Sequence, residues 1–350
     1  MSPEASGHRR SRGWRAAVVA LAVAAIAAGI VAGRHTLAES LRRLTGLDWT
    51  WFLAAIVSEF ISLAAFGLSR RRLLRADGSA AGLTTVMAIT YASNALSMTI
   101  PFAGAELAVV FSYQQLRRRG LGQAITSWAL AVSAILSTSA LAVVLVAGSL
   151  LGGASVATAI GFAGAALLLV PAVAVLLALR DQRVRRVLSV ALTRLITLGR
   201  RLLRRPPGQP ADALAEVLDR VASIRMSWPR YAEVFGLALV NWIGDCGCLA
   251  CAIHAAGQPV PWHGLLLAYA AGAAAGSTGL TPGGFGLVEA ALTAALVAVG
   301  MNSSGALTSV LAYRLVNFWM ILIGGWITMI VLTRFRSRTA TSPGSPAAPG

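Results

Sequence analysis

The sequence predicts an all-α polytopic membrane protein with about six full spans and two broken or re-entrant helical hairpins arranged as an inverted repeat. Three observations carry this prediction. The 350 residues are 57% hydrophobic and only 12% charged, with a mean hydropathy of +0.71. Several uninterrupted apolar runs reach about 20 residues, the length with which a helix crosses a bilayer. Two apolar regions are interrupted by proline and glycine, and no run alternates apolar and polar residues as a membrane strand does.

The charge of the chain is strongly positive and lies beside the apolar runs. The formal net charge is +17, from 30 basic residues, all of them arginine, against 13 acids. These arginines flank apolar segments and do not form one soluble basic domain. The pattern indicates orientation in a membrane and attraction to anionic lipid head groups at the cytoplasmic face. We therefore expect a phospholipid partner and no nucleic acid.

The N-terminal part predicts a tail and two spans. Residues 1–15 are polar and arginine-rich and form a cytoplasmic tail in this interpretation. The apolar run 16–33 has no convincing cleavage site after it, so we interpret it as a retained signal anchor. The next span, 49–69, ends at Arg70-Arg71-Arg72, which the positive-inside rule places in the cytoplasm. Glu59 lies near the middle of that span.

Residues 83–116 predict a hairpin that enters the membrane and returns to the same side. The segment is too long for one span and too short for two spans with a loop. Arginines flank it on both sides, so both of its ends are cytoplasmic. Its break lies at residues 97–106, where Pro101 and Gly104 interrupt the helix.

Two further spans and one long polar segment follow. The spans are 124–148 and 156–179, joined by a short uncharged loop that we expect outside the cell. Residues 180–230 combine many arginines with apolar residues at helical spacing. This pattern predicts an amphipathic helix on the cytoplasmic leaflet. An ordinary solvated linker is the alternative.

The span 231–256 carries one acid, Asp245, and all three cysteines, Cys246, Cys248 and Cys251. Their C-x-C-x-x-C spacing resembles a metal cluster. Buried thiols are, however, ordinary small apolar residues in such a segment, and a disulfide framework would need dispersed pairs in an extracellular domain. We expect no metal and no cofactor.

A second hairpin is predicted at residues 264–300, with external ends because its flanks lack arginine. Its break, residues 276–289, holds Pro282, several glycines and, within one turn, Glu289. Unpaired backbone and an acid at membrane depth require cover from protein or from a water-filled cavity, so we expect this break to line a substrate site. The alternative is a tight interhelical loop near the surface, in which Glu289 merely caps a helix.

The last span, 306–333, carries Arg314 about eight residues from its start, or roughly 12 Å deep. A buried arginine needs a carboxylate or a phosphate, and Glu289 is the expected protein partner. The pair is either a permanent structural one or one that opens for a lipid phosphate. The membrane domain is thus 16–333, and residues 334–350 form a disordered tail. Both termini lie in the cytoplasm in this topology, with the membrane domain in the plasma membrane.

Two span–hairpin–span units of the chain face opposite ways in this topology. Each hairpin breaks at a proline, followed by a glycine and then an acid. The two sets are Pro101, Gly104, Glu106 and Pro282, Gly286, Glu289. Opposed units with paired broken helices indicate a transporter binding site near the midplane. Helix-end N–H groups at such breaks suit an anionic group such as lipid phosphate.

Two other acids, Glu59 and Asp245, fall inside predicted spans. Either could couple transport to protons, since burial favours the neutral form of a carboxyl group. Either could equally be a hydrogen-bonded packing residue.

These stretches resemble the lysylphosphatidylglycerol synthase transmembrane region, the flippase-type domain of the multiple peptide resistance factor family. The resemblance covers most of residues 16–333. It rests on Asn94 with the Pro-Phe-Ala-Gly-Ala-Glu run at 101–106, on residues 281–289 (Thr-Pro-Gly-Gly-Phe-Gly-Leu-Val-Glu), and on Tyr313-Arg314. It implies translocation of an aminoacylated or otherwise modified phospholipid between leaflets. Full-length synthases also carry a soluble aminoacyl-transferase domain, which this sequence does not show, so we do not expect synthesis of the lysyl lipid.

The prediction that follows is an integral membrane lipid flippase or transporter for a phospholipid or lipid-linked molecule. The candidate lipid-binding residues are Asn94, Pro101, Gly104, Glu106, Pro282, Gly283, Gly284, Gly286, Glu289 and Arg314. A non-transporting scaffold for a partner lipid-modifying enzyme is the first alternative. An intramembrane enzyme is the second, but no H-E-x-x-H, G-x-S-x-G or acid-rich metal motif is present, so we assign no catalytic residue.

Overall fold

The computed structural model describes residues 46–151, 170, 224 and 226–334, and every regular element in these ranges is helical. Several predictions fall on other residues. The tail 1–15, the spans 16–33 and 156–179, and nearly all of the segment 180–230 lie outside the described ranges. The same holds for the C-terminal tail beyond Arg334.

Four helices are long and apolar enough to cross a membrane. They are α2 (Trp49–Leu74), α5 (Gln123–Leu151), α9 (Trp228–Ala255) and the continuous run Ser303–Arg334. That run consists of α12 (Ser303–Arg314), the π-helix η3 (Leu315–Met320) and α13 (Ile321–Arg334). These helices match the predicted spans at 49–69, 124–148, 231–256 and 306–333, with ends that differ by a few residues.

Both predicted breaks are present, and each divides its segment into two short helices. The first hairpin consists of α3 (Leu83–Thr99) and α4 (Gly104–Arg117). The second consists of α10 (Trp262–Ser277) and α11 (Leu287–Ala298), and its loop contains the 3-10 turn η2 (Pro282–Gly284). The longest arm has 17 residues, or about 25 Å at 1.5 Å per residue, which is less than the hydrocarbon thickness of a bilayer.

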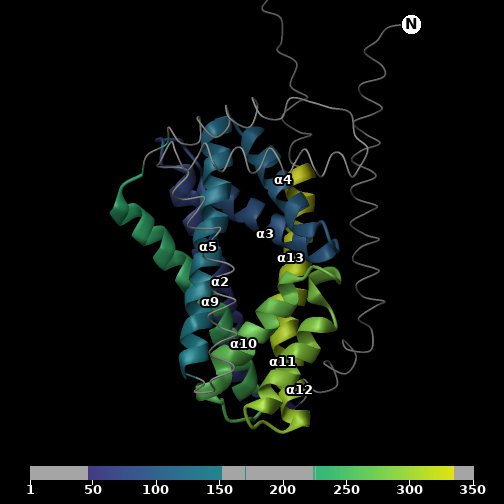
Figure 1. The fold of residues 1–350 in the computed structure, drawn as a ribbon. Coiled ribbons are helices and arrows are strands. Elements are labelled where there is room, and N and C mark those ends of the chain that lie inside the picture. The colour runs from purple at the N-terminus through teal and green to yellow at the C-terminus, as the bar shows by residue number, and fades with distance from the viewer. Residues whose placement is uncertain (1–45, 152–169, 171–223, 225, 335–350) are drawn as a thin grey trace, which may run out of the picture.

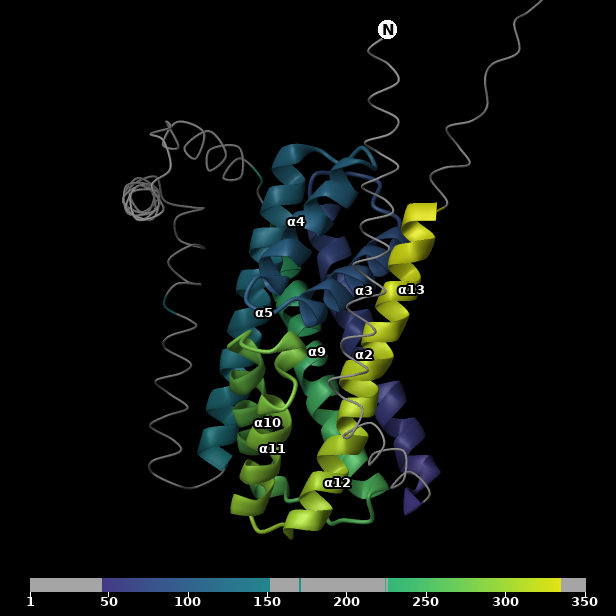
Figure 2. The same ribbon diagram turned by 90° about the vertical axis from the view of Figure 1, so that its right-hand side faces the viewer.

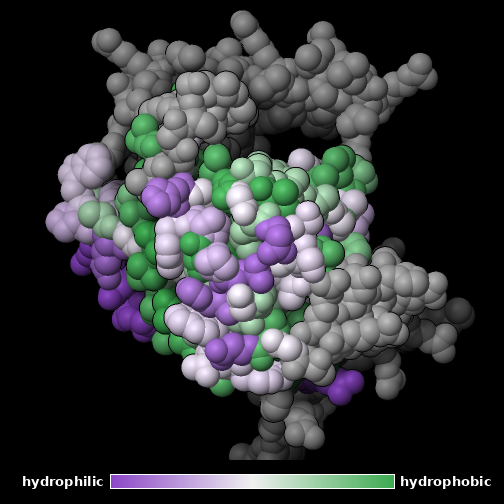
Figure 3. Space-filling view, turned by 90° about the horizontal axis from the view of Figure 1, so that it is seen from below, coloured by the Kyte–Doolittle hydropathy of each residue, from purple (hydrophilic) through white to green (hydrophobic). Residues whose placement is uncertain are grey.

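The two hairpins approach each other from opposite ends of the helical bundle, and their loops meet near its middle (Figures 1 and 2). The backbone N–H of Phe102 donates a hydrogen bond of 2.8 Å to the carbonyl oxygen of Gly279. The C-terminal ends of α4 and α13 lie at one end of the bundle. The loop between α11 and α12 lies at the other end, where polar residues gather among apolar ones (Figure 3).

Small residues let the long helices approach closely. On α2, Ser58 and Ser62 donate side-chain hydrogen bonds of 2.7 and 2.8 Å to the carbonyl oxygens of Gly244 and Asn241 on α9. A Cβ atom on Gly244 would lie 3.1 Å from Cβ of Ser62. Such close contacts, with hydroxyl groups bonded across the interface, stabilise helix pairs where no water drives association. The hairpins pack mainly against other helices, α3 against α13, α10 against α5 and α11 against α12.

Candidate functional site

A cavity of about 560 Å³ lies where the two hairpin loops meet. This volume is in the range of small-molecule sites. Its walls come from both hairpins and from α5, α9, α12 and η3. The polar lining includes Ser97, Glu106, Asp245, Tyr269, Ser277, Thr278, Thr281, Tyr313, Arg314 and Asn317.

Arg314, the last residue of α12, holds the second hairpin loop in place. Its Nε donates to Oε1 of Glu289 at 2.6 Å, and its Nη2 donates to the carbonyl oxygen of Gly283 at 2.9 Å. Its Cζ lies 4.5 Å from the centre of the Phe318 ring. The side chains of Arg314 and Glu289 are only 6% and 10% exposed. The structure thus contains the Arg314–Glu289 ion pair that the sequence predicted.

The guanidinium of Arg314 retains donors that face the cavity. A guanidinium has five N–H groups, and the two hydrogen bonds above use the one on Nε and one of the two on Nη2. Arg314 is among the residues that line the cavity. In the part of the chain that the structure describes, no acceptor bonds to Nη1. The arginine can therefore hold Glu289 and still donate to an anionic group in the cavity.

The Glu289 carboxylate accepts hydrogen bonds from two different groups. Besides pairing with Arg314, it accepts a hydrogen bond of 2.6 Å through Oε2 from the backbone N–H of Gly286. Gly286 precedes the first turn of α11, so the carboxylate caps that helix. Both ideas derived from the sequence, a helix cap and an ion-pair partner, describe parts of one arrangement.

The glycines of the second loop make this geometry possible. Gly283, Gly284 and Gly286 have φ angles of 55°, 69° and 79°, which L side chains rarely adopt. A Cβ atom on Gly283 would also collide with the ring of Phe318. The loop therefore turns tightly enough for the Gly283 carbonyl to reach Arg314.

The first hairpin has a similar break without the arginine. Glu106 is the third residue of α4, as Glu289 is the third residue of α11. Glu106 is exposed, lines the cavity and has no ion pair within the described residues. Gly104 is buried, and a Cβ atom there would collide with the carbonyl oxygen of Ser97. Phe102, at the tip, has a positive φ of 60°.

A second polar cluster lies across the cavity and is centred on Asp245. Its Oδ2 accepts a hydrogen bond of 2.7 Å from Tyr269 Oη, and its Oδ1 accepts bonds of 2.8 Å from Tyr313 Oη and from Asn317 Nδ2. The same Asn317 Nδ2 lies 3.5 Å from Oε1 of Glu59. Helices α2, α9, α10 and α12 thus meet at one hydrogen-bonded network together with η3.

The predicted site residues divide into three groups. The cavity is lined by Gly104, Glu106, Gly283, Gly284, Arg314 and Asp245. Pro282, Gly286 and Glu289 shape or support the loop beside it, and Glu59 lies behind Asp245. Asn94 and Pro101 are partly buried on the first hairpin and are not among the lining residues.

Sequence reasoning missed Tyr269 as a member of the site. Its signal was a lone tyrosine in the alanine- and glycine-rich helix α10, where a buried hydroxyl needs a partner. Asn317 lies in the π-helix η3, a form that occurs frequently at functional sites.

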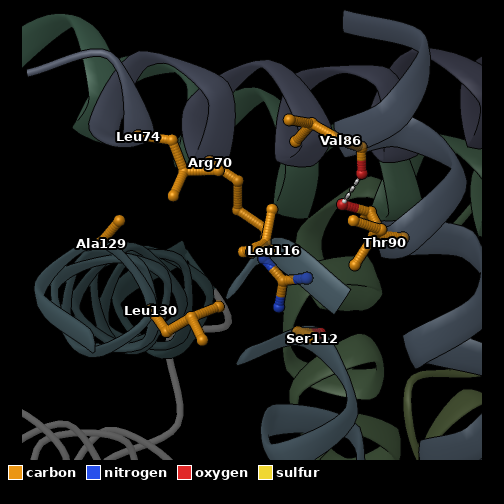
Figure 4. A pocket seen from close by; sticks show the side chains of 9 residues that line it. Arg70, Leu74, Val86, Thr90, Ser112, Leu116, Ala129 and Leu130 are labelled. Atoms are coloured by element: carbon orange, nitrogen blue, oxygen red, sulfur yellow. Dashed lines mark hydrogen bonds between the residues drawn. The ribbon is translucent and has the colours of Figure 1, made fainter. Parts of the chain in front are cut away.

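A second and much smaller cavity surrounds Arg70, near the C-terminal end of α2 (Figure 4). The guanidinium points between Leu116, Leu130 and Ser112. Its Nη1 lies 3.4 Å from Ser93 Oγ, and its Cζ lies 4.3 Å from the centre of the Phe66 ring. Among the described residues no carboxylate pairs with Arg70, and its Nε is buried without an acceptor.

The cysteines take no part in either cavity. Cys246 and Cys248 are buried and Cys251 is partly buried, all as free thiols. Over the ranges that the structure describes, no group of three or more His, Cys, Asp or Glu side chains is placed to hold a metal ion.

Comparison with known proteins identifies one family. The model of the family described as "Lysylphosphatidylglycerol synthase TM region" matches residues 17–325. No curated protein matches the chain.

Proposed function

Since the chain belongs to the lysylphosphatidylglycerol synthase transmembrane region family, we propose that it moves a phospholipid or lipid-linked molecule between the leaflets of the plasma membrane. The family match spans most of the chain, and four helices can cross a bilayer. The protein is therefore a multi-pass membrane protein related to lipid metabolism. Transport through the cavity between the hairpins is the activity that we assign to it.

The observation that carries this proposal is the hydrogen bonding of the buried Arg314 side chain. A guanidinium buried at membrane depth is held by Glu289 and Gly283 and still has N–H donors toward the cavity. Guanidinium groups bind phosphate with two parallel hydrogen bonds, and phosphate is common to all phospholipids. We assign Arg314 to the lipid phosphate and Glu289 to holding the arginine in position.

The start of α4 adds to the attraction for an anion. Gly104 and Ala105, in the first turn of α4, line the cavity. The first N–H groups of a helix have no partner within it and carry a partial positive charge. They support a phosphate that enters between the two loops.

The opposed hairpins suggest how access alternates. In the proposed topology both termini and the arginine-rich helix ends are cytoplasmic, so the first hairpin enters from the cytoplasm and the second from outside. The matching positions of Glu106 and Glu289 support an inverted repeat. Separation of the two tips on one side or the other would open the cavity to one leaflet at a time.

The test is movement of a fluorescent phospholipid across the bilayer of proteoliposomes. We expect wild type to move the lipid, and Arg314→Ala to abolish the movement at a temperature below its lowered thermal midpoint, where the variant is still folded. Arg72→Ala is the matched control, because Arg72 forms a surface ion pair of 2.8 Å with Glu233, where the two side chains are 56% and 43% exposed. Movement that survives Arg314→Ala would overturn the assigned site. Absence of movement by wild type across several head groups would favour the scaffold alternative.

A further inference from the structure

Two carboxyl groups meet inside the membrane domain without a cation of their own. Glu59, in the middle of α2, is 2% exposed. Asp245 lies opposite on α9, and both accept from the single nitrogen Asn317 Nδ2, at 3.5 and 2.8 Å respectively. The nearest arginine in the network, Arg314, is bonded to Glu289. Two adjacent ionised carboxylates are strongly unfavourable in such a setting.

The hydrogen bonds show which carboxyl group carries the charge. Asp245 accepts three good hydrogen bonds, two of them from tyrosine hydroxyls, and such bonds stabilise the ionised form. Glu59 has weaker partners, namely the long contact from Asn317 and the neighbouring Cys248 thiol, and its Oε2 is buried with no hydrogen-bond partner. If Glu59 were ionised, its Oε2 would be neither solvated nor hydrogen-bonded, which is unfavourable. The proton of the pair therefore lies on Glu59.

The groups around the pair supply no other base. From the elements packed against it, the titratable side chains facing the pair are Tyr91 on α3, Cys246 and Cys248 on α9, Tyr269 on α10, and Tyr313 and Arg314 on α12. The tyrosine and cysteine side chains are neutral when protonated, and Arg314 is already paired with Glu289. Asp245 is also the member of the pair that lines the cavity. A proton on Glu59 can thus reach the cavity through Asp245.

We propose that the Glu59–Asp245 pair is a proton-binding site that couples lipid movement to proton movement, with Glu59 holding the proton. The inference rests on the proposed transport function. In the exchange step the Oε–H bond of Glu59 breaks as an O–H bond forms on Asp245, which then gives the proton to water in the cavity. No group is oxidised or reduced.

The charges of the cavity set the direction of coupling. Beside Arg314 lie Glu289, Asp245 and the rim acid Glu106, so the site is already rich in negative charge before a phosphate enters. If the Glu59–Asp245 pair lost its proton while a phosphate was bound, the site would gain a further negative charge. The proton is therefore retained with the lipid and released after the lipid leaves. Because linkage is reciprocal, phosphate binding and proton binding strengthen each other, and both move in the same direction.

The transport test uses proteoliposomes with a pH-sensitive dye trapped inside and fluorescent phosphatidylglycerol added outside. With the outside more acidic, we expect wild type to move lipid inward faster than without a gradient and to carry protons in with it. Glu59→Gln, which keeps the shape but cannot exchange a proton, should lose both the gradient response and the proton entry. The control is Glu233→Gln, an exposed acid that should keep both. A Glu59→Gln protein that still responds to the gradient would overturn the proposal.

Infrared spectroscopy tests the proton separately from transport. A protonated carboxyl group has its own C=O stretching band, and we expect Glu59→Gln to remove one such band from the wild-type spectrum near neutral pH. If Asp245→Asn removes the band and Glu59→Gln does not, the proton is assigned to the wrong residue. If wild type shows the band but moves no lipid under any gradient, the transport function fails while the proton site stands.

Discussion

The backbone N–H of Phe102 donates to the carbonyl oxygen of Gly279 across the gap between the two hairpin tips, at 2.8 Å. The two residues lie far apart in the sequence, each in the loop of its own hairpin. Because the hairpins come from opposite ends of the bundle (Figure 2), this bond joins the two units at the cavity. In the proposed transport cycle it is a contact that breaks whenever one tip moves away from the other.

The tip of the first hairpin can be tested with glycine and proline at position 102. Phe102 has a φ of 60° and is 74% exposed, so Phe102→Gly removes left-handed strain at the loss of little packing. We expect it to leave the thermal midpoint unchanged or to stabilise the protein by up to about 1 kcal/mol. Phe102→Pro should lower the midpoint, since proline lacks the donor and cannot adopt this φ. Thermal unfolding in detergent measures both, and equal midpoints would contradict the role of the bond.

Gly283 is a position of the second loop at which a side chain is poorly tolerated. Gly283→Ala adds a Cβ atom at a φ of 55° and against the ring of Phe318. We expect a loss of about 1–3 kcal/mol in stability together with loss of lipid movement. Gly286→Ala is the comparison, because its φ is 79° but no atom lies near an added Cβ. It should cost less, and a larger loss than at Gly283 would contradict the packing explanation.

The buried ion pair predicts strong coupling between Arg314 and Glu289. Removing one partner leaves the other charge buried and unpaired, which costs about 3–5 kcal/mol. Arg314→Met and Glu289→Gln should each lower the thermal midpoint, while the double variant should lose much less than the sum of the two. Thermal unfolding of the four proteins forms a double-mutant cycle. Additive losses would show that the two side chains do not act as a pair.

We expect the opposite effect on stability when Arg70 is replaced by methionine. Its guanidinium lies in a largely apolar cavity, with no carboxylate partner among the described residues and with Nε unsatisfied (Figure 4). Burial of a cation without a partner is unfavourable, so an apolar side chain of similar length should fit at least as well. We expect Arg70→Met to leave the thermal midpoint unchanged or to raise it. A marked decrease would indicate that an anion outside the described residues pairs with Arg70.

Much of the architecture could be predicted because it depends on local composition. The bounds of α2, α5, α9 and the α12–α13 run follow from apolar length, and the breaks at Pro101 and Pro282 follow from a missing N–H and flexible glycines. The partnership of Arg314 with Glu289 could also be predicted, since a buried arginine needs an anion and few acids lie at that depth. The inverted repeat and the count of six spans stay predictions, because two of the spans lie outside the described residues.

The chemistry of the site depended on contacts between distant parts of the chain. From the sequence, Glu59 and Asp245 are single acids on two helices, either of them a packing residue. Only packing of α2 against α9 brings both to Asn317, and only the tyrosines of α10 and α12 make one carboxyl group a good acceptor and leave the other with weaker partners. Helix length and breaks are encoded within a window of residues, and so the sequence alone determined them. The position of a charge and of its proton depends on neighbours from several helices, and so the tertiary structure decided it.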